Sequence, residues 1–255
     1  MDGLRRLVEN AYALLREGYY DAPGSAARSP SFLDVLGTAD QPSDVIAEIK
    51  FASPAGGSGK SPAAFADLLD RIAGARPLGL SVLAEPRIFG GSLAFVCEAA
   101  AKGLPVLMKD VVIDPVQIKA AAASGASAVL VIETLFARGL VPGPSQALVD
   151  AAHERDLDVV LEVHSSAEWD VAVRTDADIL GINNRDLSSM VVDPSTTPSL
   201  LSSRPKDRPV IAMSGIDGRD QVDAMLRAGA DAVLVGSSIM AHPDPARKLE
   251  ELLHG

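Results

Sequence analysis

Charged and amide side chains stand at the ends of several apolar segments that have strand character. These side chains are Glu48 and Lys50 in one segment, Lys109 in a second, Glu162 in a third, and Asn183 and Arg185 in a fourth. An unpaired charge in a buried strand carries a desolvation cost of several kcal/mol, so the strand itself gains nothing from it. Lysines gathered among carboxylates can instead supply a general acid and a general base at neutral pH. The pattern predicts a shared polar site with acid–base chemistry.

The elements that must position these side chains are short apolar runs separated by helical patterns. Eight runs are strand candidates: Val45–Lys50, Gly79–Ala84, Val106–Lys109, Ala128–Ile132, Asp158–Val163, Ile179–Asn183, Val210–Ser214 and Ala232–Gly236. Because they are rich in Val and Ile without polar alternation, they indicate parallel strands buried on both faces, which need crossover helices. Helical spacing in Asp114–Ser124 and Asp220–Gly229 fits such crossovers. Eight strand–helix units predict an α/β fold, a (β/α)8 TIM barrel.

Residues 1–44 are expected to form a helical extension and connector that precede the barrel. Apolar residues recur there at helical spacing among charges, namely Leu4, Leu7, Val8, Ala11, Leu14 and Leu15. The connector that follows, roughly residues 22–43, contains Pro, Ser and Gly and has no strong period. Since barrels of about 250 residues form one unit, residues 1–255 are predicted to be a single domain.

In such a barrel the carboxyl-terminal strand ends meet at one mouth. Glu48 and Lys50 are two residues apart, so both would lie on one face of their strand and point into that mouth. Lys109 and Glu162 would reach the same place from the third and fifth strands. A buried salt-bridge network could explain one such pair, but structural pairs seldom recur at one end of so many strands.

Small residues follow the last two predicted strands. Ser214-Gly215 ends one strand and Gly236-Ser237 ends the other. Backbone N–H groups at small residues can approach a phosphate, and barrel enzymes commonly bind phosphate between these two loops. The segment from Ser53 to Lys60 superficially resembles a phosphate loop but lacks the Walker spacing. We interpret it as a mobile loop that carries Ser53 to the substrate.

Composition excludes several other classes of function. The formal net charge of −11 disfavours a nucleic-acid surface and an anionic membrane as partners. Cys97 is the only cysteine, which rules out an internal disulfide and suits a reducing, cytoplasmic compartment. No apolar stretch approaches the roughly 18 residues needed to span a bilayer. The four histidines lack metal-ligand spacing and no nucleotide fingerprint is present, so neither a metal nor a cofactor is predicted.

Along nearly its whole length the chain resembles the indole-3-glycerol-phosphate synthase family of tryptophan biosynthesis. The matching segments are 46–50 with Ser53-Pro54, 81–83 with 89–92, 104–110 with 114–115 and 117–118, 162–164, 181–187, 214–216 and 234–237. The resemblance implies conversion of 1-(2-carboxyphenylamino)-1-deoxyribulose 5-phosphate into indole-3-glycerol phosphate, carbon dioxide and water, without a cofactor.

The resemblance also implies a role for each site residue. Lys109 would be the general acid, Lys50 would hold the substrate carboxylate or assist proton transfer beside Glu48, and Glu162 would act as base or acid in dehydration. Asn183 and Arg185 would orient the sugar hydroxyls and carboxylates. The substrate-binding residues it implies are Ser53, Ser214, Gly215, Gly236 and Ser237 on the phosphate side, and Phe89, Leu187 and Leu234 around the aromatic ring.

The chain departs from the family pattern at two positions. The seventh strand usually ends in Ser-Glu-Ser-Gly, but here Met213 replaces the active-site glutamate. Phe51 replaces a basic residue after the first lysine and is expected to face outward. Two alternatives stay open, a barrel like phosphoribosylanthranilate isomerase and a non-catalytic barrel that binds a phosphorylated ligand. The expected ligand is a phosphorylated small molecule. The protein is expected to be a monomer or a weak homo-oligomer, which could associate with other tryptophan-pathway enzymes.

Overall fold

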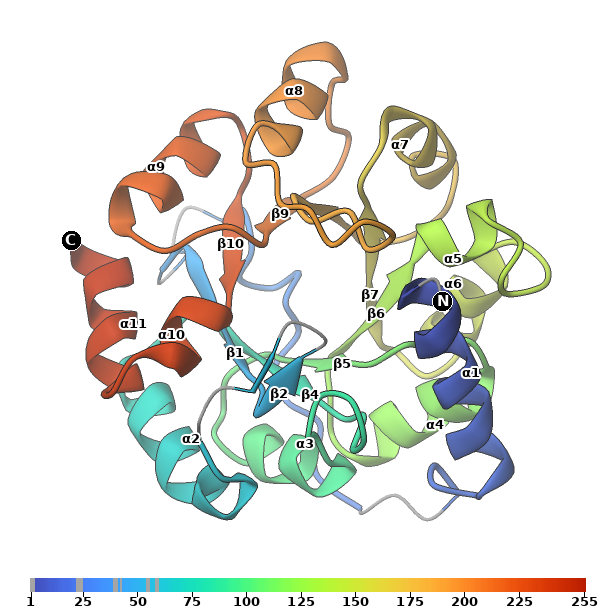
Figure 1. The fold of residues 1–255 in the computed structure, drawn as a ribbon, viewed down its shortest axis with the longest axis horizontal. Coiled ribbons are helices and arrows are strands. Elements are labelled where there is room, and N and C mark those ends of the chain that lie inside the picture. Colours follow the sequence, from blue (N-terminus) through green and yellow to red (C-terminus); the bar gives the residue numbers. More distant parts are fainter. Residues whose placement is uncertain (1–2, 22–24, 39–40, 42, 54–55, 58–59) are drawn as a thin grey trace.

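A closed barrel of eight parallel strands forms the centre of the computed structural model, which describes residues 3–21, 25–38, 41, 43–53, 56–57 and 60–255 (Figure 1). The barrel strands are β1 (Val45–Ile49), β4 (Gly79–Leu83), β5 (Val106–Lys109), β6 (Ala128–Ile132), β7 (Asp158–Val163), β8 (Ile179–Asn183), β9 (Val210–Met213) and β10 (Ala232–Val235). Each strand pairs with its neighbours in chain order, and β10 closes the ring against β1. The predicted (β/α)8 fold is confirmed.

Strand boundaries differ from the prediction only at four carboxyl ends. Lys50, Ala84, Ser214 and Gly236 each lie one residue beyond the strand that was expected to contain them. At Ser214 the reason is visible in the backbone, whose φ of 69° leaves the extended region and turns the chain out of the sheet. Two short strands were not predicted, β2 (Ala52–Ser53) and β3 (Gly56–Gly57), which pair antiparallel in the loop after β1.

Helices connect the strands and surround the barrel (Figure 1). They are α1 (Gly3–Arg16), the short 3-10 turn η1 (Pro62–Ala64), α2 (Phe65–Gly74), α3 (Leu93–Ala100), α4 (Pro115–Ala123), α5 (Glu133–Ala137), α6 (Gln146–His153), α7 (Ser166–Ala172), α8 (Thr196–Ser203), α9 (Arg219–Arg227), α10 (Ser237–Ala241) and α11 (Pro245–His254). Capping boxes fix the starts of α4, at Asp114, and of α7, at Ser165. None of the described helices combines the length and apolarity needed to cross a membrane.

Two hydrophobic layers hold the barrel together. One lies between strands and helices, and the other fills the inside of the barrel. Phe51 belongs to the outer layer, where its ring centroid lies 6.4 Å from that of Phe65 and 5.9 Å from that of Phe95. The expected outward orientation of Phe51 is therefore confirmed, and aromatic packing takes up the side chain.

The N-terminal extension contacts the barrel at two places, one through its first helix and one further along through Phe32. The predicted amphipathic helix is α1, which buries Leu4, Leu7, Val8, Ala11 and Leu14. Further along, Phe32 is buried beneath the barrel interior, and its backbone N–H donates to Asp158 at the start of β7. Gly79 has no room for a side chain because the Phe32 ring occupies that space. The connector thus closes the amino-terminal end of the barrel.

Candidate active site

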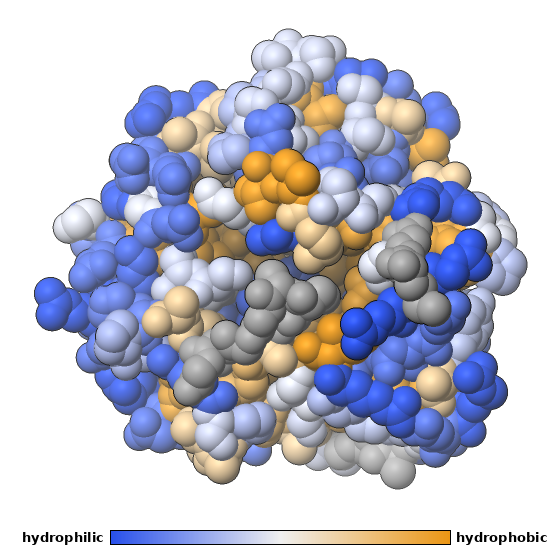
Figure 2. Space-filling view, in the orientation of Figure 1, coloured by the Kyte–Doolittle hydropathy of each residue, from blue (hydrophilic) through white to orange (hydrophobic). Residues whose placement is uncertain are grey.

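The carboxyl-terminal strand ends line two adjoining cavities at the mouth of the barrel. Both cavities have Glu48, Lys50, Lys109, Arg185, Ser214 and Ser237 in their walls. Figure 2 looks onto this face, where apolar side chains border a central hollow. Because parallel strands point the same way around the ring, groups distant in sequence converge here, as the strand-end pattern predicted.

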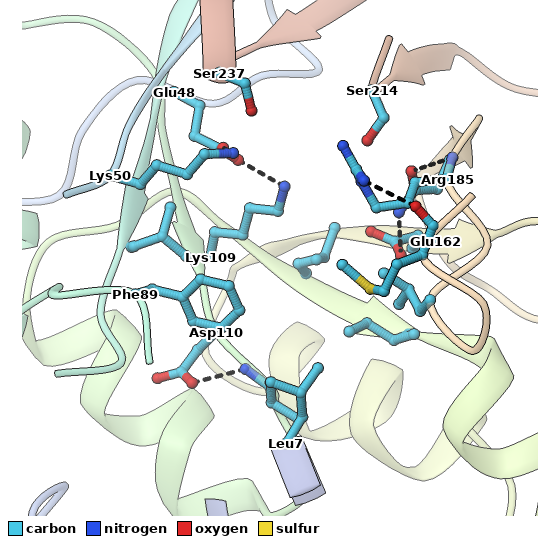
Figure 3. A pocket seen from close by; sticks show the side chains of 17 residues that line it. Leu7, Glu48, Lys50, Phe89, Lys109, Asp110, Glu162, Arg185, Ser214 and Ser237 are labelled. Atoms are coloured by element: carbon cyan, nitrogen blue, oxygen red, sulfur yellow. Dashed lines mark hydrogen bonds and ion pairs between the residues drawn. The ribbon is translucent and has the colours of Figure 1, made fainter. Parts of the chain in front are cut away.

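Glu48 lies between the two lysines of the mouth. Its Oε1 is 2.6 Å from Lys50 Nζ and its Oε2 is 2.6 Å from Lys109 Nζ, while the residue is only 2% exposed (Figure 3). Burial alone would raise the pKa of Glu48, but the two ammonium groups outweigh it and lower this pKa to about 2. Burial also opposes the charged form of Lys109, yet Glu48 and Glu162 raise the Lys109 pKa above its usual value. Lys109 therefore stays protonated at neutral pH.

Glu162, on β7, lies across the cavity from Glu48 and the two lysines (Figure 3). Asn183 Nδ2 donates to Glu162 Oε1 at 2.9 Å, and Asn183 Oδ1 accepts the Arg185 backbone N–H at 2.9 Å. Burial raises the pKa of Glu162, although Lys109 and Asn183 oppose that effect. The Arg185 guanidinium donates to the carbonyl of Met190 at 3.0 Å. A carboxyl group with a raised pKa is thus held in a fixed orientation by an amide.

The first cavity is largely apolar beyond its charged rim. Its apolar lining residues are Leu7, Leu83, Phe89, Val111, Leu130, Ile132, Leu187 and Met190. Asp110 also reaches this wall; its Oδ2 accepts from the Tyr20 hydroxyl at 2.9 Å, and burial raises its pKa to about 7. A planar hydrophobic group of a ligand fits such a lining.

The second cavity lies between the loops that follow β9 and β10. Its lining includes Gly215, Leu234, Gly236 and Met213 in addition to the shared residues. Gly215 has a φ of 74°, and Ser238 Oγ donates to the carbonyl of Ile216, which ties the two loops together. A Cβ at Gly236 would collide with the Glu48 carboxylate. Small residues therefore line this end of the cavity, and Glu48 packs directly against the backbone at Gly236.

The structure gathers most of the predicted site residues into these walls. Glu48, Lys50, Lys109, Glu162, Asn183, Phe89, Arg185, Leu187, Ser214 and Ser237 line the first cavity. Gly215, Leu234 and Gly236 line the second, so Leu234 lies on the loop side and not in the wall that contains Phe89 and Leu187. Ser53 belongs to β2, and its side chain lies outside the described part of the structure, as do the neighbouring residues 54–55 and 58–59.

Several residues of this region were not among the predicted site residues, including four that lie outside the barrel strands. Leu7 and Tyr20 come from the N-terminal extension, Asp110 follows Lys109, and Met190 adopts a φ of 62° in the loop after β8. The amphipathic pattern of α1 was a usable signal for Leu7, since its apolar face needs a partner. Nothing in the sequence marks Met190. Within the described residues, no three or more His, Cys, Asp or Glu side chains gather closely enough to hold a metal ion.

Fold and site together define a (β/α)8 barrel of the enzyme type, with lysines and carboxylates at its mouth and with one apolar and one loop-lined cavity. The family model described as indole-3-glycerol phosphate synthase matches residues 10–252. The chain belongs to the indole-3-glycerol phosphate synthase family, and its activity is that of a carboxy-lyase. The family match decides against the isomerase alternative.

Relatives of known function support the same assignment. The indole-3-glycerol phosphate synthase of Opitutus terrae is 36% identical over 233 residues, covering 89% of this chain and 86% of the relative. That of Polynucleobacter asymbioticus is 40% identical over 209 residues, covering 82% and 77%. Among solved structures, a 3-hexulose-6-phosphate synthase superposes with a TM-score of 0.60 at 17% identity, covering 82% of this chain and 97% of that one. This last likeness concerns the fold alone.

Proposed function

We propose that Lys109 is the general acid of the ring closure that produces indole-3-glycerol phosphate. The aromatic ring of the substrate must attack a ketone carbon, and the ketone oxygen then needs a proton. Lys109 suits this role because it stays charged and lies in the wall shared by both cavities. Its contact with Glu48 fixes the ammonium group at the boundary between ring and sugar phosphate. This position of Lys109 is the single observation that carries the proposal.

The cations of the mouth match the charges of the substrate. The mouth contains three cationic side chains and two carboxylates, which leaves an excess of positive charge. The cations are Lys50, Lys109 and Arg185, and the carboxylates are Glu48 and Glu162. A substrate that carries both a carboxylate and a phosphate would compensate that excess. We assign the substrate carboxylate to Lys50 and the orientation of the sugar hydroxyls and carboxylates to Arg185 and Asn183.

Glu162 is proposed to move protons in the later dehydration. After the ring has closed, the carboxylate leaves as carbon dioxide because the neighbouring cationic centre accepts its electrons. Loss of the hydroxyl as water then requires one proton to be removed and one to be supplied. Glu162 suits this task because burial raises its pKa above the usual value, while Asn183 holds one oxygen and leaves the other available.

The two cavities are proposed to sort the two ends of the substrate. Phe89 and Leu187 would enclose the aromatic ring in the first cavity. The phosphate would lie in the second cavity against Ser214, Gly215, Gly236 and Ser237, with Ser53 approaching from β2; this proposal is supported by the small residues and by the tie between the two loops. Leu234 lies in the second cavity and would pack against the sugar chain there.

The decisive assay uses purified protein and 1-(2-carboxyphenylamino)-1-deoxyribulose 5-phosphate. We expect indole fluorescence to appear together with one equivalent of carbon dioxide. If the protein binds the substrate but forms neither product, even at high protein concentration, a non-catalytic barrel is favoured. That alternative arises because Met213 replaces the family's glutamate. Inorganic phosphate as a competitive inhibitor would support the assignment of the second cavity.

We further propose that the protein works in the cytoplasm as a monomer or weak homo-oligomer, with residues 1–255 as one barrel domain that includes the extension 1–44. The acidic net charge of −11 supports a freely dissolved enzyme, because like charges keep copies apart. Association with other tryptophan-pathway enzymes would be weak and salt-dependent. Light scattering after size exclusion, over a range of concentrations, measures the assembly state.

A further inference from the structure

Glu85 is a buried acidic residue that lines neither cavity in the described part of the chain. It is 1% exposed and lies in the loop between β4 and α3. Its carboxyl group accepts three backbone N–H groups of its own loop, from Arg87 at 2.7 Å, Ile88 at 2.6 Å and Phe89 at 2.9 Å. A carboxyl that receives consecutive N–H groups fixes the course of the backbone, since each lost bond would leave a poorly solvated donor.

The loop that Glu85 organises carries a wall of the apolar cavity. Phe89 is the last of the three donors, and its side chain lines the cavity. The Phe89 carbonyl in turn accepts the N–H groups of Phe51 at 3.2 Å and Ala52 at 3.0 Å, the latter in β2. Gly91 completes the loop by packing against the Leu83 carbonyl, where a side chain would collide. The loop therefore connects the cavity wall that contains Phe89 to β2, the strand that contains Ser53.

The same carboxyl group also reaches the N-terminal extension. Asn10 Nδ2 of α1 donates to Glu85 Oε1 at 2.8 Å, across 75 positions of sequence. An exposed ion pair between Glu17 and Arg87 adds a second, weaker link between these segments. Leu7, one helical turn before Asn10, lines the cavity beside Phe89. Two parts of the apolar wall thus depend on one buried side chain.

We propose that Glu85 is a positioning residue for the synthase reaction, which fixes the Phe89 loop and couples the N-terminal extension to the wall that receives the aromatic ring of the substrate. The inference rests on the proposed role of Phe89 in enclosing that ring. Glu85 acts through Phe89 and α1 and does not touch the reacting atoms. Its loss misplaces a binding wall, so it weakens substrate binding more than it slows proton transfer.

The test is a double-mutant cycle between Glu85→Gln and Phe89→Ala, read as KM and kcat separately. Gln keeps the volume of Glu85 but turns one acceptor into a donor, and either oxygen that it replaces accepts from two donors. We expect Glu85→Gln to raise KM about tenfold while kcat changes less than about threefold. In the Phe89→Ala background, Glu85→Gln should then raise KM no more than about threefold, which is the share expected from the link to α1.

Asp158→Asn is the matched control. Asp158 is also a buried carboxyl that accepts backbone N–H groups from an N-terminal segment, but it lies at the closed end of the barrel. The Asp158→Asn variant should have a lower melting temperature than the unaltered protein and the same KM. Should Glu85→Gln fail to fold, Asn10→Ala removes only the link to α1 and should raise KM about threefold.

The outcomes separate the two claims. If Phe89→Ala has the KM of the unaltered protein, the proposed ring site is wrong. If Phe89→Ala raises KM but Glu85→Gln does not, or if the two effects multiply, the positioning role of Glu85 is overturned. A rise in KM for Asp158→Asn equal to that for Glu85→Gln would also overturn it, because general loss of stability would then explain both.

Discussion

Lys109 Nζ and Glu48 Oε2 lie 2.6 Å apart inside the mouth of the barrel, and this contact joins the third barrel strand to the first. The Glu48 carboxylate is one of the charges that raise the pKa of Lys109. A general acid must be protonated, so activity is lost as the pH rises through the Lys109 pKa. We expect Glu48→Gln to move the basic limb of the kcat/KM profile to lower pH. An unchanged limb would contradict this coupling, and Asp70→Asn at an exposed ion pair serves as the control.

Removal of the Lys109 ammonium should slow turnover strongly. We expect Lys109→Ala to lower kcat by about 10² or more, as is usual when a general acid is lost. Indole fluorescence under saturating substrate measures the rate. Lys102→Ala removes a lysine from a surface ion pair with Asp70 and should have no effect. A kcat for Lys109→Ala within threefold of the unaltered protein would exclude Lys109 as the acid.

The acidic limb of the same profile should report Glu162. This carboxyl must be ionised to act as a base, and Asn183 opposes the rise in its pKa by donating a hydrogen bond. We therefore expect Asn183→Leu to move the acidic limb to higher pH and to lower kcat about tenfold. Glu162→Gln should abolish that limb. If the limb persists in Glu162→Gln, another group controls it.

Met213 offers a direct test of the departure from the family pattern. The residue is 1% exposed and lines the second cavity together with Lys50, Lys109 and Arg185. A glutamate carboxylate at this position would meet those cations, so we expect Met213→Glu to raise kcat about tenfold. Met213→Gln has a similar length without the charge and should give no gain. Equal rates for the two variants would show that the missing carboxylate has no catalytic part.

Stability should depend on pH through Asp110. Burial raises its folded-state pKa to about 7, well above the usual 3.8. Between these values the folded protein keeps a proton that the unfolded chain has lost, so this contribution to stability falls as the pH rises from about 4 to about 7. Asp110→Asn lacks the titration. Its free energy of unfolding should gain about 2.6 kcal/mol relative to the unaltered protein between pH 5 and pH 8.

Urea titrations of both proteins at the two pH values measure this difference. A constant difference in unfolding free energy across the range would show that Asp110 does not titrate there. Asn has one acceptor oxygen for the Tyr20 hydroxyl and the Val111 N–H, and the cost of losing one of these bonds is the same at both pH values, so it cancels in the comparison.

Much of the site was predictable because it depends on strand ends. Lys109 is the last residue of β5 and Glu162 the second last of β7, and the closure of a barrel brings such strand ends together whatever their separation in sequence. Four predicted strands were one residue too long at their carboxyl ends. At Ser214, for example, a left-handed backbone conformation ends β9 without a glycine. The family resemblance grouped Leu234 with Phe89 and Leu187, and Leu234 lines the second cavity, because strand period gives the face of a strand but not which cavity that face lines.

The contribution of the extension could not be predicted from local pattern. Tyr20 meets Asp110 across 90 positions of sequence, and the amphipathic spacing of α1 does not say which surface receives its apolar face. Such docking follows from tertiary contacts alone. The same limit explains why Glu85 was not recognised, since its partners are mostly backbone groups that leave no trace in side-chain type.

The close approach of Gly236 to Glu48 has a consequence for how this enzyme can change. Any side chain at residue 236 would displace the carboxylate that steadies both lysines. Under the proposed assignment, recognition of the sugar phosphate and protonation of the substrate share a wall and cannot be adjusted one at a time. Redesign of the barrel for a bulkier or uncharged substrate terminus would have to begin at Glu48, with Gly236 following.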